Sequence, residues 1–214
     1  LLILEIFYSG HLDGFVILFL FLSIYLYLKR KYFLSSFFLT ISVLTKIYPI
    51  IFLPFIIVDL FKKRGLQKTL IYLFIFLSTT VIFYLPFITK SPSAITRYIF
   101  LAGEQEFNAS LYRYLYQIFG SHSISYLLFF VSSLILLTKK FSLKLLILMG
   151  ITYLAFSPIV FPWHTLFIIP LIFLEAKMSK SFSIIIPLII IQFLITFSYF
   201  EPGEKLLRET LLNL

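Results

Sequence analysis

The residues in this chain that could do chemistry are few, and Lys46 is the most unusual of them. It lies within the apolar run Tyr32–Phe61, two residues before Tyr48 and three before Pro49. A lysine held in a membrane needs an anion. Since no acidic residue is near it in the sequence, we expect Lys46 to bind a lipid phosphate, with the Tyr48 hydroxyl closing the same pocket. The structural alternative is that Lys46 pairs with the carbonyls at a helix C-terminus.

Asp13 is the second candidate, at the start of the apolar run Leu12–Leu28. The free N–H groups and the dipole at a helix N-terminus favour a carboxylate there. Asp13 could act as a base or orient a sugar hydroxyl, with His11 sharing this catalytic work. The alternatives are an N-cap for Asp13 and a simple interfacial position for His11. Their spacing matches no zinc motif, so we predict no metal.

The polar stretch of residues 89–122 adds further candidates. Arg97 and Arg113 are expected to contact the donor phosphate, because a guanidinium binds oxyanions with two parallel hydrogen bonds. Alternatively, each arginine is solvated or pairs with a neighbouring acid. Other side chains of this loop have carboxylate or amide groups that could hold sugar hydroxyls: Glu104, Glu106 and Asn108.

A late turn contains the last candidates, Trp163 and His164, next to Pro158 and Pro162. Trp163 could stack on the substrate, and His164 could bond to the lipid phosphate or to the sugar. Anchoring at the membrane interface explains the tryptophan equally well.

The composition is that of a membrane protein. The 214 residues are 61% hydrophobic and 13% charged, against about 25% charged in soluble domains, and the mean hydropathy is +1.05. The absence of cysteine excludes disulfides and thiolate metal sites. The net charge of +9 does not indicate nucleic acid, because the basic residues gather in short loops between apolar runs. No nucleotide-binding loop, zinc-protease motif or serine-hydrolase motif occurs.

The elements that must position these residues are membrane helices. Four apolar runs are suited to single spans of about 20 residues: Leu12–Leu28, Leu70–Ile88, Ile124–Thr138 and Phe182–Phe200. Two more, Tyr32–Phe61 and Leu145–Leu174, would each reach roughly 45 Å as one helix and contain prolines, so we expect each to be a hairpin of two short helices. The prediction is an all-α polytopic bundle of about eight membrane segments. It forms one domain over 1–214, with short interfacial helices in the outer loop 89–122.

The distribution of charge supports both hairpins. With both reversals, 12 of the 18 basic residues lie on the cytoplasmic side, as the positive-inside rule requires. Lys46 and His164 then lie at the outer face. The 12 cytoplasmic residues are Lys29, Arg30, Lys31, Lys62, Lys63, Arg64, Lys68, Lys139, Lys140, Lys144, Lys177 and Lys180.

These motifs, taken in order, are similar to those of a known family. The segment Gly10–Gly14, the segment Leu44–Pro54 and the late Ser157–His164 turn resemble the GT-C superfamily of integral-membrane glycosyltransferases. The likeness is greatest to mannosyltransferases that use polyprenyl-phosphate mannose, of the glycosyltransferase family 87 type. The chain also resembles the first mannosyltransferase of glycosylphosphatidylinositol assembly.

The resemblance implies inverting transfer of a sugar, expected to be mannose, from a polyprenyl phosphate to a glycan, lipid or protein acceptor at the outer face, without a cofactor. Asp13 matches the family's acidic position at a helix mouth, and Lys46 matches its lysine near the lipid phosphate. We expect the family's principal catalytic aspartate, its first outer loop and further helices to lie upstream of this chain. The location would be the plasma membrane in a prokaryote or the endoplasmic reticulum in a eukaryote.

Three rival functions remain open at this point. The nearest is a ligase or polymerase of lipid-linked oligosaccharides, which would share a lipid-phosphate pocket. A secondary transporter or lipid flippase also has broken helices and buried charge, although transporter sites lie near the membrane midplane between repeats. The third is a noncatalytic subunit that completes the active site of another chain.

Overall fold

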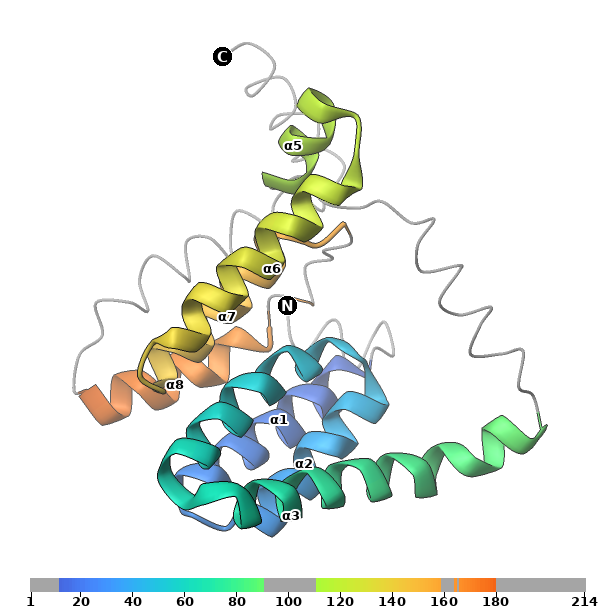
Figure 1. Cartoon of the computed structure of the whole chain (residues 1–214), viewed down its shortest axis with the longest axis vertical. Helices are drawn as coiled ribbons and strands as arrows, with labels where there is room; N and C mark the ends of the chain where they lie inside the picture. The colour runs from blue at the N-terminus through green and yellow to red at the C-terminus, as the bar shows by residue number, and fades with distance from the viewer. Residues whose placement is uncertain (1–11, 91–110, 159–163, 165, 180–214) are drawn as a thin grey trace.

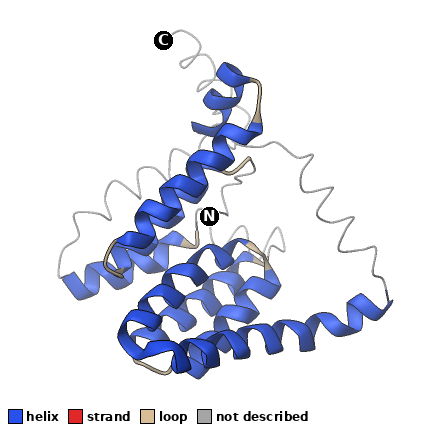
Figure 2. Ribbon diagram, in the orientation of Figure 1, coloured by secondary structure: helices blue, strands red, loops and turns tan. Residues whose placement is uncertain are grey.

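The computed structural model describes residues 12–90, 111–158, 164 and 166–179. All the regular structure within these ranges is helical (Figure 2). The predicted all-α fold is therefore confirmed for the described residues. The expected helix Phe182–Phe200 lies outside them.

The first two helices form an antiparallel pair, α1 (Asp13–Leu28) and α2 (Tyr32–Thr45). Small polar side chains let the two backbones approach closely, as at many membrane helix interfaces. The Ser23 hydroxyl donates to the Ser35 carbonyl at 2.8 Å, and the Ser42 hydroxyl donates to the Val16 carbonyl at 2.9 Å. These bonds fix the register of the pair.

The chain reverses directly after α2, as the predicted first hairpin requires. The short 3-10 helix η2 (Tyr48–Phe52) has Pro49 in its first turn, where the missing N–H of proline removes no helical hydrogen bond. Helix α3 (Leu53–Lys90) then runs back beside α2, and its Asp59 reaches Tyr27 of α1. The reversal predicted at Lys46–Pro49 is confirmed.

Gly65 divides α3 into two helical parts, residues 53–64 and 66–90, which run in different directions (Figure 1). We expected the basic residues 62–68 to form a loop before a separate helix over Leu70–Ile88, and this was wrong. The residues directly before and directly after Gly65 are both helical, and only Gly65 itself has non-helical angles. Its dihedral angles, φ 77° and ψ −179°, lie in a region that only glycine adopts readily.

The second group of helices contains α5 (Leu111–Phe119), α6 (His122–Thr138), α7 (Leu143–Phe156) and α8 (Ile168–Ser179). One of the short helices expected in the outer loop 89–122 is present as α5. Gly150 lets α7 approach α8 closely, because a Cβ there would lie 3.0 Å from side-chain atoms of Phe167 and Ile168. Helices α7 and α8 flank the second predicted hairpin, whose tip lies mostly outside the described residues.

Apolar helices give the described part its membrane character. One helical stretch, Tyr48–Phe87, is long and apolar enough to cross a membrane, and four shorter apolar helices accompany it: α1, α2, α6 and α7. The part of α3 after Gly65 would reach about 37 Å. Its side chains are widely exposed, with Phe74 at 71% and Phe87 at 68%, as expected for contact with lipid. The total of about eight membrane segments stays a prediction.

Candidate functional site

Asp13, Lys46 and Tyr48 form one cluster at the end of the first helix pair. The Lys46 ammonium lies 2.5 Å from Asp13 Oδ2, and the Tyr48 hydroxyl donates to Asp13 Oδ1 at 3.1 Å. Both carboxylate oxygens are therefore engaged. Lys46 and Tyr48, which were predicted to share one pocket, both bond to Asp13, which was predicted as a separate candidate.

The ends of three elements position this cluster. Asp13 is the first residue of α1, and Leu12 is the N-cap, without a side-chain capping bond. The suggestion that Asp13 caps the helix was therefore wrong, although the helix dipole still favours its charge. Lys46 follows α2 in an extended conformation, φ −151° and ψ 142°. This extended step directs the chain away from the helix before η2 begins at Tyr48.

Burial differs strongly among the three side chains. Asp13 is fully buried, Tyr48 is 5% exposed, and the Lys46 side chain is 27% exposed. Lysine has three N–H donors, and Asp13 accepts one of them. Asp13 thus fixes the ammonium on its buried side, and the other two N–H donors of Lys46 stay available at its exposed side.

Asp13 also corrects the environment predicted for Lys46. We expected no acid near this lysine, and the pairing with helix carbonyls was the alternative. The structure instead brings in Asp13, 33 residues earlier in the chain. A lysine paired with one carboxylate oxygen can still bind a phosphate, because its partly exposed ammonium keeps two N–H donors that Asp13 does not take.

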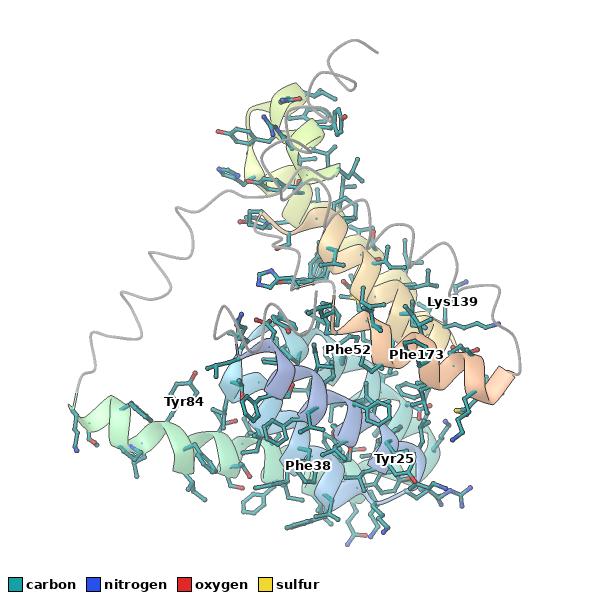
Figure 3. The ribbon with its side chains drawn as sticks, turned by 180° about the vertical axis from the view of Figure 1, so that it is seen from behind. Tyr25, Phe38, Phe52, Tyr84, Lys139 and Phe173 are labelled. Carbon is teal, nitrogen blue, oxygen red and sulfur yellow. The ribbon has the colours of Figure 1, made fainter. Side chains whose placement is uncertain are left out.

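Aromatic side chains attach this cluster to the second group of helices. The Tyr48 ring centroid lies 5.0 Å from that of Phe167, 5.6 Å from that of His164 and 6.2 Å from that of Tyr153. His164, predicted as a site residue, is therefore brought beside Tyr48. Tyr153 and Phe167 were missed, although a tyrosine one turn before the Ser157–Pro158 turn was a usable signal. Figure 3 shows the neighbouring Phe52 where the two groups of helices meet.

Exposed apolar residues flank the cluster in sequence, and we call them the apolar rim. Its members are large hydrophobic residues next to the cluster in sequence that remain exposed: Leu12 at 53%, Phe15 at 53%, Ile47 at 64% and Ile50 at 40%. A cation within an apolar rim is suited to an amphiphile with a charged head and a hydrocarbon tail.

A second buried charged cluster, which we did not predict from the sequence, lies at the opposite end of α1. The Tyr27 hydroxyl donates to Asp59 Oδ2 at 2.7 Å, and the Lys63 ammonium lies 2.9 Å from Asp59 Oδ1. Asp59 is only 6% exposed. The i,i+4 spacing of Asp59 and Lys63 was the available signal.

The remaining predicted site residues are not brought to Lys46 by the described contacts. Arg113 is exposed on α5, which Figure 1 places away from α1 and α2. In the described ranges no group of three or more His, Cys, Asp and Glu could hold a metal ion. The other predicted site residues lie outside the described residues and stay predictions: His11, Arg97, Glu104, Glu106, Asn108 and Trp163.

Comparison with known proteins gives a family. No curated protein and no solved structure matches this chain significantly. A family model described as ALG3 protein matches residues 3–168, a range that includes Asp13, Lys46, Tyr48 and His164.

Proposed function

We propose that this chain, which belongs to the ALG3 protein family and is therefore a membrane mannosyltransferase of the GT-C type, uses dolichyl-phosphate mannose and binds the donor phosphate at the Lys46 cluster. The match supports the GT-C mannosyltransferase resemblance. It does not extend to family 87 or to the glycosylphosphatidylinositol enzyme. Family members reside in the endoplasmic reticulum membrane of eukaryotes and take a lipid-linked oligosaccharide as acceptor.

The observation that carries this proposal is the partly exposed ammonium of Lys46 on a fully buried carboxylate. In mannosyl transfer the bond from the sugar's anomeric carbon to the donor phosphate breaks, and the dolichyl phosphate leaves with the electron pair. A cation fixed in advance beside the phosphate oxygen that leaves the sugar stabilises the negative charge that develops on it. Asp13 fixes the ammonium, so little reorganisation is needed when the phosphate arrives.

The apolar rim supports the same assignment. Ile47 and Ile50 flank the cluster in sequence and are 64% and 40% exposed. An isoprenoid tail lying against such residues would stay in hydrocarbon while its phosphate reaches Lys46. A water-soluble nucleotide sugar would gain nothing from this rim.

In this mechanism Asp13 orients Lys46 and is not the base, because both of its oxygens are already engaged. The acceptor hydroxyl attacks the anomeric carbon from the side opposite the phosphate, so the transfer inverts. A different carboxylate takes the hydroxyl proton, as the GT-C resemblance implies for an aspartate in the first outer loop. The mechanism needs neither a metal nor a cofactor.

We place this chemistry at the outer, lumenal face. Exposed basic residues occupy the turns at the opposite end of α1, among them Lys29, Lys31 and Lys139. Lys and Arg in short loops favour the cytoplasmic side, so the Lys46 end faces the lumen. The multi-pass arrangement with an outer-face acceptor is part of this proposal.

Steady-state kinetics with dolichyl-phosphate mannose test the assignment on the full-length enzyme in nanodiscs. Lys46→Met should lower kcat/KM for the donor by about 10²-fold to 10³-fold, the loss typical of removing one transition-state donor. Lys46→Arg should retain more activity than Lys46→Met, because it keeps the charge. Lys68→Met, which removes an exposed lysine after the Gly65 turn, is the matched control and should leave the rate unchanged. An unchanged kcat/KM in Lys46→Met would remove Lys46 from donor binding.

A further inference from the structure

A second basic site lies far from the Lys46 cluster. A cavity of about 330 Å³ lies between the first part of α3 and the turn that joins α6 to α7. Its charged lining residues are Asp59, Lys62, Lys63, Lys139 and Lys140. Four lysines and one aspartate give the cavity a formal charge of +3, which favours the binding of an anion.

The single acid of this cavity is already occupied. Asp59 accepts a hydrogen bond from Tyr27 at 2.7 Å and pairs with Lys63 at 2.9 Å. Among the described lining residues, no further carboxylate is available for the other three lysines. The excess charge therefore belongs to Lys62, Lys139 and Lys140, all of which are exposed.

Apart from Thr138, the rest of the cavity lining is apolar, which favours an amphiphile over a free ion. The apolar side chains that line it are Phe55, Val58, Leu137, Phe141 and Leu145. Leu134 lies one helical turn before Thr138, another lining residue, and is 48% exposed. An acyl chain could leave the cavity along this apolar face of α6, whereas a free phosphate would make no favourable contact with that face.

The cavity also lies at the basic end of the molecule. Arg64 donates to the Tyr32 hydroxyl at 3.1 Å, which joins the Gly65 turn to the α1–α2 turn. Lys63 lies over the Phe141 ring, 5.6 Å from its centroid, which joins the same turn to the α6–α7 turn. In the orientation proposed above, the exposed basic turns at this end face the cytoplasmic leaflet, which contains the anionic lipids.

From these observations we infer that the cavity between α3 and the α6–α7 turn binds the headgroup of an anionic phospholipid. The lysines contact its phosphate, and its acyl chains lie along α6. Asp59 keeps Lys63 in place at the cavity wall. This lipid is separate from the sugar donor, because Asp59 bonds to Tyr27 at one end of α1 and Lys46 bonds to Asp13 at the other.

Lipid titration of the full chain in detergent micelles, followed by native mass spectrometry, tests the inference. The probe is dioctanoyl phosphatidylserine, with dioctanoyl phosphatidylcholine and inorganic phosphate as comparison ligands. The variant Lys139→Gln/Lys140→Gln should raise the apparent Kd for phosphatidylserine roughly thirtyfold, equivalent to about 1 kcal/mol for each lysine. The control Lys29→Gln/Lys177→Gln removes the same charge from exposed positions outside the cavity and should change the Kd little.

Three results would overturn the inference. Equal losses in both double variants would indicate a diffuse surface effect. Equal affinity for phosphatidylcholine would show that the lysines do not select the anion. Displacement of phosphatidylserine by an equal concentration of inorganic phosphate would assign the cavity to a soluble anion. Because both substituted lysines are exposed, unfolding of the variant is not expected, and circular dichroism checks it.

Discussion

Replacing Lys46 with methionine separates what the ion pair does for the fold from what it does for the donor. Asp13 is fully buried, and its charge is balanced by Lys46 and held by Tyr48. Removing one partner of a buried pair costs about 3–5 kcal/mol, because the other charge is left without compensation. The 27% exposure of Lys46 admits some water, so we expect the lower end, about 3 kcal/mol.

A loss of this size is measurable by thermal unfolding in nanodiscs. For a chain of this length, about 3 kcal/mol corresponds to a fall in Tm of roughly 6–12 °C. The double variant Asp13→Asn/Lys46→Met should recover most of this loss, because replacing both charges of a buried pair is often close to neutral. The introduced asparagine would still accept a hydrogen bond from the hydroxyl of Tyr48, so the local packing is kept.

Activity should behave differently from stability in the same variants. Mannosyl transfer should stay low in Asp13→Asn/Lys46→Met even when Tm recovers, because no ammonium faces the phosphate. A double variant that recovers both Tm and transfer would refute the proposed role and make the pair purely structural. A Lys46→Met protein with the parent's Tm would refute the energetic reasoning itself.

Other substitutions test single features of the fold and the site. Tyr48→Phe keeps the ring contacts and removes the bond to Asp13, so it should cost about 1.5–3 kcal/mol in thermal unfolding and lower kcat/KM; unchanged stability would contradict that bond. Gly65→Ala should cost about 1–3 kcal/mol, even though an added Cβ meets nothing within 4 Å, because only the backbone angle is unfavourable; a stabilised variant would argue against it. Gly150→Ala should cost about 1–3 kcal/mol by crowding Ile168 across the α7–α8 contact, and a Tm equal to the parent's would show that this contact relaxes freely.

The sequence predicted the first hairpin well because two independent constraints agreed. The apolar run Tyr32–Phe61 is too long for one span, and Pro49 marks where a helix must end. The structure places η2 at that point. The same reasoning identified both flanks of the second hairpin, α7 and α8.

Pairing between distant residues was harder to predict, although the Asp13–Lys46 contact left a signal. In an antiparallel hairpin, residues at equal distances from the turn meet. Asp13 lies about 17 residues before Arg30 and Lys46 about 16 after it, so the α1–α2 register brings them together. The Tyr27–Asp59 bond had no such signal, because it depends on how α3 packs against α1.

The abrupt change of direction at Gly65 shows a limit of another kind. Four basic residues near it, together with the apolar runs on either side, were consistent with a loop or with helix ends. One residue makes the turn because glycine alone adopts its backbone angles at little cost. Sequence composition cannot distinguish a one-residue turn from a loop of several residues.

The positions of the two buried charged clusters favour chemistry at a membrane face over transport through the membrane. Asp13 and Tyr27 are separated along α1 by about 21 Å at 1.5 Å per residue, within a hydrocarbon core of about 30 Å. Between them, the buried Ser23 bonds to the Ser35 carbonyl, and no described charged residue occupies this part of α1. A transporter needs its polar site near the midplane, whereas this bundle keeps charge at its two ends, with Lys46 reaching the surface at one of them.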